Sequence, residues 1–188
     1  MYMKIEPGIK LDFSDVLIRP KRSTLSSRSE VSLNRTFKFK YSEREWTGVP
    51  IMVSNMDTVG TVEMFCSLST QGLLTCLHKY INMDDVIAAC AAGQGNPEHL
   101  ILSTGISDKD YEHLVNNVFK LKESGIDLGF ICIDVANGYM FKLVKFCRKV
   151  REMFPNITLI AGNVVSREMT EELIINGKVD IVKIGIGS

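Results

Sequence analysis

The 188-residue sequence lacks several features that would assign it to a class at once. It has no apolar run of the roughly 18 residues that a membrane-spanning helix needs, and residues 1–10 have no apolar signal-peptide core. Lys and Arg together number 22, as do Asp and Glu, so the net charge gives no general attraction to nucleic acid or membranes. We therefore expect a globular protein with no nucleic-acid or membrane partner.

Cysteines are few, and their spacing suggests no pairing. The five cysteines form no CxxC motif, are odd in number and lie mostly in apolar runs: Cys66, Cys76, Cys90, Cys132 and Cys147. This pattern is typical of buried thiols in a reducing compartment. It predicts a cytoplasmic protein.

The neutral total conceals an uneven distribution of charge. Residues 1–40 contain nine Lys or Arg and four Asp or Glu, a balance of +5, and the remainder carries −5. A basic arm could contact a phosphate group or a neighbouring subunit, but a solvated arm explains the composition equally well. We expect residues 1–49 to form an N-terminal arm with a strand-capping segment, and residues 50–188 to form the main domain.

From residue 50 onward, short apolar runs alternate with segments of helical period. Continuous apolarity is typical of parallel strands covered on both faces. The predicted strands are Pro50–Asn55, Leu73–His78, Leu100–Thr104, Phe130–Val135, Thr158–Asn163 and Ile181–Ile186. The predicted helices are Thr58–Thr70, Met83–Ala92, Lys109–Glu123, Tyr139–Met153 and Arg167–Ile175, and we expect Asp57, Asn82, Asp108 and Ser166 to cap the helices that follow them.

Six such βα units fit either a (β/α)8 barrel or a doubly wound sheet. Polar residues gather where the predicted strands end, and barrel enzymes place their chemistry on this C-terminal rim. No strand is followed at once by the GxGxxG of a dinucleotide-binding turn. Both features favour an α/β fold of the TIM (β/α)8 barrel type. Because a barrel needs eight units, we expect it to be truncated after about the sixth strand.

Several segments form long motifs: Lys10–Ser23, Asn55-Met-Asp-Thr-Val-Gly60, Cys132-Ile-Asp-Val-Ala-Asn-Gly-Tyr139, Ala161-Gly-Asn-Val-Val165 and Val182-Lys-Ile-Gly-Ile-Gly187. In this order they resemble the IMP dehydrogenase/GMP reductase family from about Lys10 to Ser188. Within that family they resemble the reductase. Only 21 residues, Lys79 to His99, precede the third predicted strand, which leaves no room for the dehydrogenase's usual regulatory modules.

The resemblance implies NADPH-dependent reductive deamination of GMP to IMP and ammonia. In the family a Cys thiolate attacks purine C2, ammonia leaves and the resulting thioimidate accepts hydride. That Cys follows the sixth strand, whereas this sequence ends at Gly185-Ile-Gly-Ser188, so we assign no catalytic residue and expect this chain alone to be inactive. Two alternatives stay open: an IMP dehydrogenase without its regulatory insert, and a non-catalytic truncated isoform.

The resemblance also implies a cofactor site shared between the subunits of a homotetramer. It assigns NADPH contacts to Ser27, Arg28, Lys79, Asp134, Val135, Ala136, Ile186 and Gly187. The alternatives from the residues alone are a solvated arm for Ser27 and Arg28, a solvated Lys79, and an Asp134 that only caps a helix. Asn55 and Met56 could line the nucleotide pocket.

The resemblance further implies a monovalent cation, usually potassium, at the carbonyl groups around Gly187. The alternative is a tight turn without an ion, and half of the carbonyl cage would lie beyond Ser188.

A basic helix contains Lys142, Lys145, Arg148, Lys149 and Arg151. Without interleaved aromatic residues it indicates a solvated face and no nucleic-acid surface.

Overall fold

The computed structural model of this chain describes residues 5, 7–9 and 11–186, which fall into two units divided between Ser32 and Leu33. The first unit is an extended segment with two short 3-10 helices, η1 (Phe13–Asp15) and η2 (Arg28–Glu30). The second unit contains the remaining elements. The boundary that we expected at residue 49 lies inside a strand of this second unit, β2 (Glu45–Val53).

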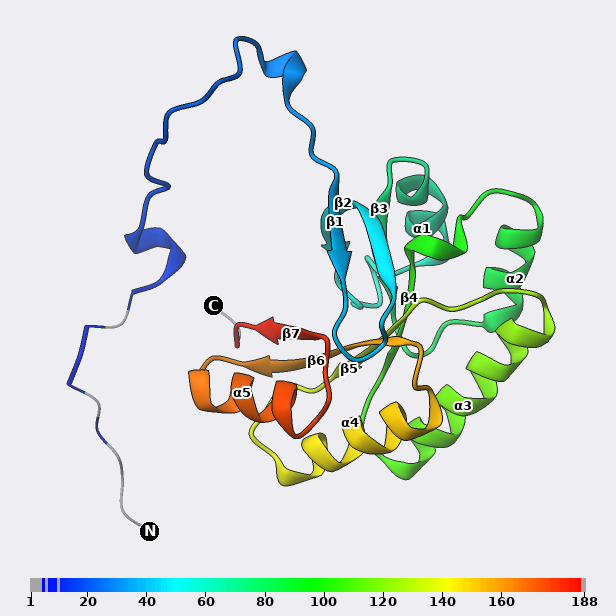
Figure 1. The fold of residues 1–188 in the computed structure, drawn as a ribbon. Coiled ribbons are helices and arrows are strands. Elements are labelled where there is room, and N and C mark those ends of the chain that lie inside the picture. The colour runs from blue at the N-terminus through cyan, green and yellow to red at the C-terminus, as the bar shows by residue number, and fades with distance from the viewer. Residues whose placement is uncertain (1–4, 6, 10, 187–188) are drawn as a thin grey trace. The chain divides into compact units, whose positions relative to one another are not determined.

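The second unit alternates strands with helices along the chain (Figure 1). The strands after β2 are β3 (Leu73–Leu77), β4 (Leu100–Thr104), β5 (Phe130–Asp134), β6 (Thr158–Val164) and β7 (Ile181–Ile184). The helices are α1 (Val62–Ser69), α2 (Met83–Ala91), α3 (Asp108–Glu123), α4 (Phe141–Met153) and α5 (Arg167–Ile175), with a 3-10 helix, η3 (Pro97–His99), before β4. Strands β2 to β7 pair in sequence order and all run parallel.

The continuous apolar runs are explained by two apolar layers, one on each face of the sheet. Because successive residues of a strand point to opposite faces, Leu100 and Leu102 pack outward against the helices while Ile101 points inward. Strand β5 does the same, with Ile131 outside and Phe130 inside. The predicted parallel α/β architecture is therefore confirmed, and the described residues supply six of the eight strands that close a barrel.

The base of the sheet is covered by a hairpin that we did not predict. Strand β1 (Arg35–Lys38) pairs antiparallel with the first half of β2. Phe39 and Trp46 of this hairpin pack edge-on against Phe130 of β5, with ring centroids 5.7 and 6.3 Å apart. Strand β1 contains Arg35 and Lys38, and all four of its side chains are exposed, so it lacks the continuous apolar run that marks the other strands.

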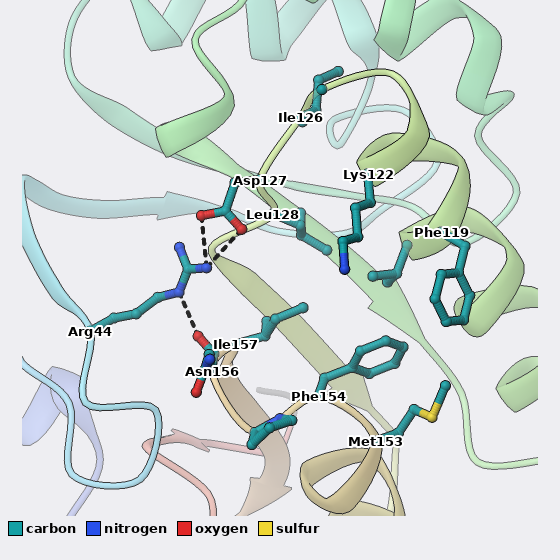
Figure 2. Close-up of a pocket in the computed structure, with 13 residues that line it drawn as sticks. Arg44, Phe119, Lys122, Ile126, Asp127, Leu128, Met153, Phe154, Asn156 and Ile157 are labelled. Carbon is teal, nitrogen blue, oxygen red and sulfur yellow. Dashed lines mark hydrogen bonds and ion pairs between the residues drawn. The ribbon is translucent and has the colours of Figure 1, made fainter.

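Arg44, in the turn of this hairpin, is fixed by polar contacts at the same end of the sheet. Its Nη2 atom lies 2.8 and 2.9 Å from the carboxylate oxygens of Asp127, and its Nε atom donates to the Asn156 carbonyl. Figure 2 shows these contacts beside a hollow of about 460 Å³ between the ends of α3 and α4. This hollow lies where β5 and β6 begin, the end of a barrel that serves stability and not catalysis.

Two predicted helix caps are wrong. Thr61, not Asp57, caps α1: its Oγ1 accepts from the Met64 backbone N–H at 3.3 Å. Ser107, not Asp108, caps α3, in a reciprocal capping box with Asp110. Both true caps are hydroxyl residues three positions before the N–H that they accept from, as capping geometry requires. The caps predicted at Asn82 and Ser166 are confirmed.

Glycines follow the ends of two helices, as the sequence predicts. Gly93 and Gly125 come just after α2 and α3 and have φ angles of 68° and 76°, a backbone conformation that glycine adopts without steric cost. Within the described residues, no helix combines the length and apolarity needed to span a membrane.

Candidate functional site

A hollow of about 170 Å³ opens at the C-terminal ends of the strands. It is lined by Asn55, Asp57, His78, Lys79, Tyr80, Ser103, Thr104, Gly105 and Asp134. These residues follow or end β2, β3, β4 and β5, so the predicted gathering of polar side chains at this rim is confirmed. Pockets that enclose a whole ligand hold about 300–1,000 Å³. We therefore interpret these residues as one wall of a larger site.

Asp134, at the end of β5, lies at the centre of a network that joins three strands. Its Oδ2 atom accepts from Asn55 Nδ2 at 2.7 Å, and its Oδ1 atom lies 2.8 Å from Lys183 Nζ. Lys183 also donates to Asn55 Oδ1 at 3.4 Å. Asn55 follows β2 and Lys183 belongs to β7, so the three side chains meet across the mouth of the curled sheet. The carboxylate is thus held in one orientation and does not cap α4, whose N-cap has no side-chain hydrogen bond.

Two buried thiols lie near this network on the inner face of the sheet. Burial works against the charged form of Lys183, but the nearby Cys132 and the hydrogen bond to Asp134 outweigh it and raise the pKa of Lys183. A hydrogen bond with Cys132, together with burial, raises the pKa of Cys76 well above its usual value. Cys76 is therefore a neutral thiol beneath a protonated Lys183.

Lys79, just after β3, is held by an acidic residue in the first turn of α3. Its Nζ atom lies 3.2 Å from Asp110 Oδ1, and this hydrogen bond raises the pKa of Lys79. Burial favours the neutral form of Asp110, but hydrogen bonds from Ser107 and Lys79 outweigh it and lower the pKa of Asp110. Lys79 also lies over the ring of Tyr80, 5.2 Å from its centroid. With 38% of its side chain exposed, Lys79 remains accessible to an anion.

Ser27 and Arg28 lie in the first unit. The Oγ atom of Ser27 caps η2 by accepting from the Ser29 backbone N–H at 3.3 Å and lies 2.8 Å from Ser29 Oγ. Arg28 is the first residue of η2 and is exposed. The predicted cofactor contact of these two residues remains a prediction.

The other predicted contacts divide between β5 and the end of β7. Val135 exchanges backbone hydrogen bonds with Gly162 and Asn163, each 2.9 Å long, and Ala136 is exposed. Ile186 is 45% exposed, and Gly187 lies outside the described residues.

Tyr139 closes the Asp-Val-Ala-Asn-Gly-Tyr motif and connects two rim loops. Its hydroxyl oxygen accepts from the backbone N–H groups of Ser166 at 2.9 Å and Val165 at 3.1 Å. Hydrogen bonding with the Ser166 side chain, and then with the backbone N–H groups of Val165 and Ser166, lowers the pKa of Tyr139. The residue therefore ties the β5–α4 loop to the start of α5.

The cysteines lie within regular elements, as predicted: Cys66 in α1, Cys76 in β3, Cys90 in α2, Cys132 in β5 and Cys147 in α4. Burial raises the pKa of Cys90 and raises that of Cys147 to about 12. A nucleophilic cysteine needs a lowered pKa and access to solvent. We therefore assign no nucleophile among them, in agreement with the sequence.

Lys183 is the rim residue that the sequence analysis missed. A signal was present, because Lys183 is a single charged residue within the apolar run Ile181–Ile186. A charge in a strand covered on both faces needs a partner, and Asp134 at the end of β5 provides one. Asn55, which we considered only as possible pocket lining, is the third member of the network.

Comparison with known proteins identifies the family. The family model described as "IMP dehydrogenase / GMP reductase domain" matches residues 10–188. The chain is 50% identical over 186 residues to proteins named GMP reductase from Klebsiella pneumoniae subsp. pneumoniae and Citrobacter koseri, and 49% identical to one from Shigella boydii. Each match covers 98% of this chain and 52% of the relative, so the chain spans about half the length of these curated relatives.

The fold resembles that of a solved structure, and this match also covers about half of the other chain. A crystal structure of inosine 5′-monophosphate dehydrogenase from Legionella pneumophila superposes with a TM-score of 0.70 at 24% identity, over 94% of this chain and 50% of that one. At this identity the likeness is one of fold, and it agrees with the incomplete barrel described above. With the family model matching 179 of the 188 residues, from residue 10 to residue 188, the chain belongs to the IMP dehydrogenase/GMP reductase family.

Proposed function

We propose that the protein containing this chain is a GMP reductase, which converts GMP to IMP and ammonia at the expense of NADPH. The observation that carries the proposal is the 50% identity to proteins named GMP reductase over 98% of the chain. The connection between β3 and β4 supports it. This connection holds only α2 and η3, and a dehydrogenase would typically carry its regulatory modules there.

The chemistry of the rim residues fits a dinucleotide. Lys79 offers a partly exposed ammonium to a phosphate group as a point charge. Tyr80 offers a ring that is 73% exposed, and Asp134 offers a carboxylate that can accept hydrogen bonds from ribose hydroxyl or carboxamide groups. NADPH, when bound, supplies the hydride that the reductive step requires.

The residues of this chain bind and orient the dinucleotide. Lys79 exchanges its bond to Asp110 for one to a phosphate oxygen. Asp134, held by Asn55 and Lys183, accepts from the nicotinamide half of the cofactor, and the backbone of Val135 and Ala136 lines the same edge. Asn55 and Met56, which follow β2, are the candidates for lining the nucleotide pocket. We assign the nucleophile and the proton relay to none of the described residues.

Several finer assignments belong to the same proposal. We propose that the basic arm with Ser27 and Arg28 contacts NADPH bound to a neighbouring subunit of a homotetramer, and that the protein is cytoplasmic. Ile186 and Gly187 would contact the cofactor. A potassium ion would bind carbonyl groups around Gly187. What supports the ion is the φ angle of 129° at Gly185, which only glycine adopts readily. Because Gly187 lies outside the described residues, we derive no step through the ion.

A coupled assay of the protein expressed from its complete gene tests the proposal. We expect GMP to drive the oxidation of NADPH, followed by the loss of absorbance of the reduced nicotinamide, with one ammonia and one IMP formed for each NADPH consumed. NADH serves as the cofactor control. Turnover of IMP with NAD would instead identify a dehydrogenase without its insert. Absence of both reactions would favour a non-catalytic product.

A further inference from the structure

Lys183 is the one lysine of β7, and it points into the mouth of the sheet toward two other strands. Its Nζ atom lies 2.8 Å from Asp134 Oδ1 and 3.4 Å from Asn55 Oδ1. Asn55 in turn donates to Asp134 Oδ2 at 2.7 Å. The three side chains therefore form a closed ring of contacts, in which each member touches the other two.

The burial of this ring makes it more than a surface ion pair. The side chains of Lys183 and Asp134 are 27% and 28% exposed, so both are largely removed from water. Exposed ion pairs contribute little because both side chains remain mobile and screened by solvent. Here each carboxylate oxygen of Asp134 has its own partner, which restrains the rotation of the carboxylate. The raised pKa of Lys183 agrees with an ammonium that is held in its charged form.

We propose that Lys183, together with Asn55, is a positioning residue that orients the Asp134 carboxylate for the hydrogen-bond donors of the dinucleotide. The inference rests on the proposed function, in which Asp134 contacts the cofactor. Lys183 acts through Asp134, and its contribution is to the binding of the cofactor and not of the purine nucleotide. A carboxylate that is already oriented loses less rotational freedom when a ligand binds, which is the general advantage of preorganisation.

The arrangement predicts a definite pattern of coupling between the two residues. If Lys183 works only by orienting Asp134, removing it after Asp134 has been neutralised should change cofactor binding little. Substitutions at two independent sites would instead multiply their effects on affinity. A double-mutant cycle therefore separates a positioning role from a separate contact between Lys183 and the cofactor.

The test measures the dissociation constants of NADPH and GMP for the protein expressed from its complete gene, by cofactor fluorescence and by calorimetry. The variants are Lys183→Met, Lys183→Arg, Asp134→Asn and the double variant Lys183→Met/Asp134→Asn. Lys120→Met is the matched control, because Lys120 pairs with Asp84 at 2.7 Å between α2 and α3, away from the rim. Asn55→Ala provides a second approach to the same carboxylate if Lys183→Met folds poorly.

We expect Lys183→Met to weaken NADPH binding about tenfold, because the unrestrained Asp134 carboxylate then loses up to one charge-assisted contact with the cofactor, and to leave GMP binding unchanged. Lys183→Arg should restore most of the affinity, and the double variant should bind NADPH no more weakly than Asp134→Asn. Wild-type affinity in both Lys183→Met and Asn55→Ala would overturn the inference alone, as would multiplicative effects in the double variant. Failure of the wild-type protein to bind NADPH would overturn the proposed function and this inference with it.

Discussion

The carboxylate of Asp180, which has no exposed side-chain surface, lies 2.6 Å from the guanidinium of Arg151. The same carboxylate accepts from the backbone N–H groups of Tyr41 at 2.8 Å and Leu159 at 3.1 Å. Arg151 in turn donates to the carbonyls of Pro155 and Ile157. One buried ion pair thus joins the turn of the β1–β2 hairpin, the end of α4 and the starts of β6 and β7.

We expect Asp180→Ala to destabilise the protein strongly, because it leaves Arg151 buried without its charge partner. Loss of one member of a buried pair typically costs about 3–5 kcal/mol. The measurement is the free energy of unfolding from urea titration of the protein and the variant. Asp127→Ala is the control: its side chain is 81% exposed where it meets Arg44, and a pair of that kind contributes at most about 1 kcal/mol. Equal losses of unfolding free energy in the two variants would contradict this role of the Arg151–Asp180 pair.

The strands could be predicted from the sequence because both faces of each are covered by one chain. Leu100 and Leu102 pack against helices and Ile101 packs inside, so the run is apolar throughout and its position is clear. The five helices were also found. Four of them have a polar N-cap residue and a glycine within three residues of their end, and α4 was found by its helical period alone. What could not be found was strand β1. Its pairing with β2 is antiparallel and its side chains are exposed, so it lacks the continuous apolar run by which the other strands were found.

The candidate site was predictable only in part, for a physical reason. That polar residues end the strands can be read from the sequence, and Asp134 and Lys79 were identified in this way. Which of them meet depends on how the sheet curls. The contact of Asn55 with Lys183 joins residues 128 positions apart. Lys79 contacts Asp110, 31 positions along the chain in the first turn of α3. Side chains in the turns before helices compete for the same N–H groups, so the choice of Ser107 over Asp108 was not determined by residue type alone.

The capping box of α3 gives a second test of stability. We expect Ser107→Ala to cost about 1 kcal/mol, because the Asp110 backbone N–H loses its acceptor at 3.0 Å. Asp108→Ala should cost less, since Asp108 is the first residue of the helix and not its cap. Unfolding titrations of both variants against the parent protein measure the difference. A larger loss for Asp108→Ala would restore the cap that the sequence suggested.

His99 makes the stability depend on pH in a defined direction. Burial lowers the pKa of His99, and among the described residues its Nδ1 atom has no hydrogen-bond partner. Below the ordinary pKa of about 6.5, the unfolded chain therefore binds more protons than the folded one. Stability is fully present above that pH and decreases as the pH falls toward the lowered pKa. Urea titrations at several pH values between 5 and 8 should show this loss in the parent protein and a smaller loss in His99→Gln. The same dependence in both proteins would assign the effect to other groups.

Substitution of Lys79 tests the proposed contact between the rim residues and the cofactor. We expect Lys79→Ala to weaken NADPH binding about tenfold, the loss of one charge-assisted contact, and to change the Michaelis constant for GMP little. Lys79→Arg is the matched variant that keeps the charge. Because the pKa of Lys79 is raised by Asp110, the side chain is protonated throughout the neutral range. The contribution of Lys79 to NADPH binding should therefore be constant between about pH 6 and about pH 9. An unchanged Michaelis constant for NADPH would count against the contact.

The peptide of residues 1–188, expressed alone, should associate with itself. Among the described residues, β7 pairs with β6 on one side and with no strand on the other, and Ile184 on this edge is 69% exposed. A hollow of about 570 Å³ lies on the inner face between β2 and β7, lined in part by Met52, Leu74, Ile181 and Val182. An apolar edge of this kind offers unpaired backbone groups to another chain.

Sedimentation velocity over a range of concentrations measures this association, and thermal unfolding measures cooperativity. We expect oligomers or precipitation for the parent peptide and less association for Ile184→Lys, because a charged side chain discourages pairing at a strand edge. A monomer that melts cooperatively at all concentrations would contradict the edge argument. The same peptide should show no GMP-dependent oxidation of NADPH, since its cysteines lie within strands and helices. Replacing these cysteines by Ser one at a time should therefore leave the rate of NADPH oxidation unchanged. Measurable turnover that disappears on replacing one of them by Ser would identify a nucleophile within this chain.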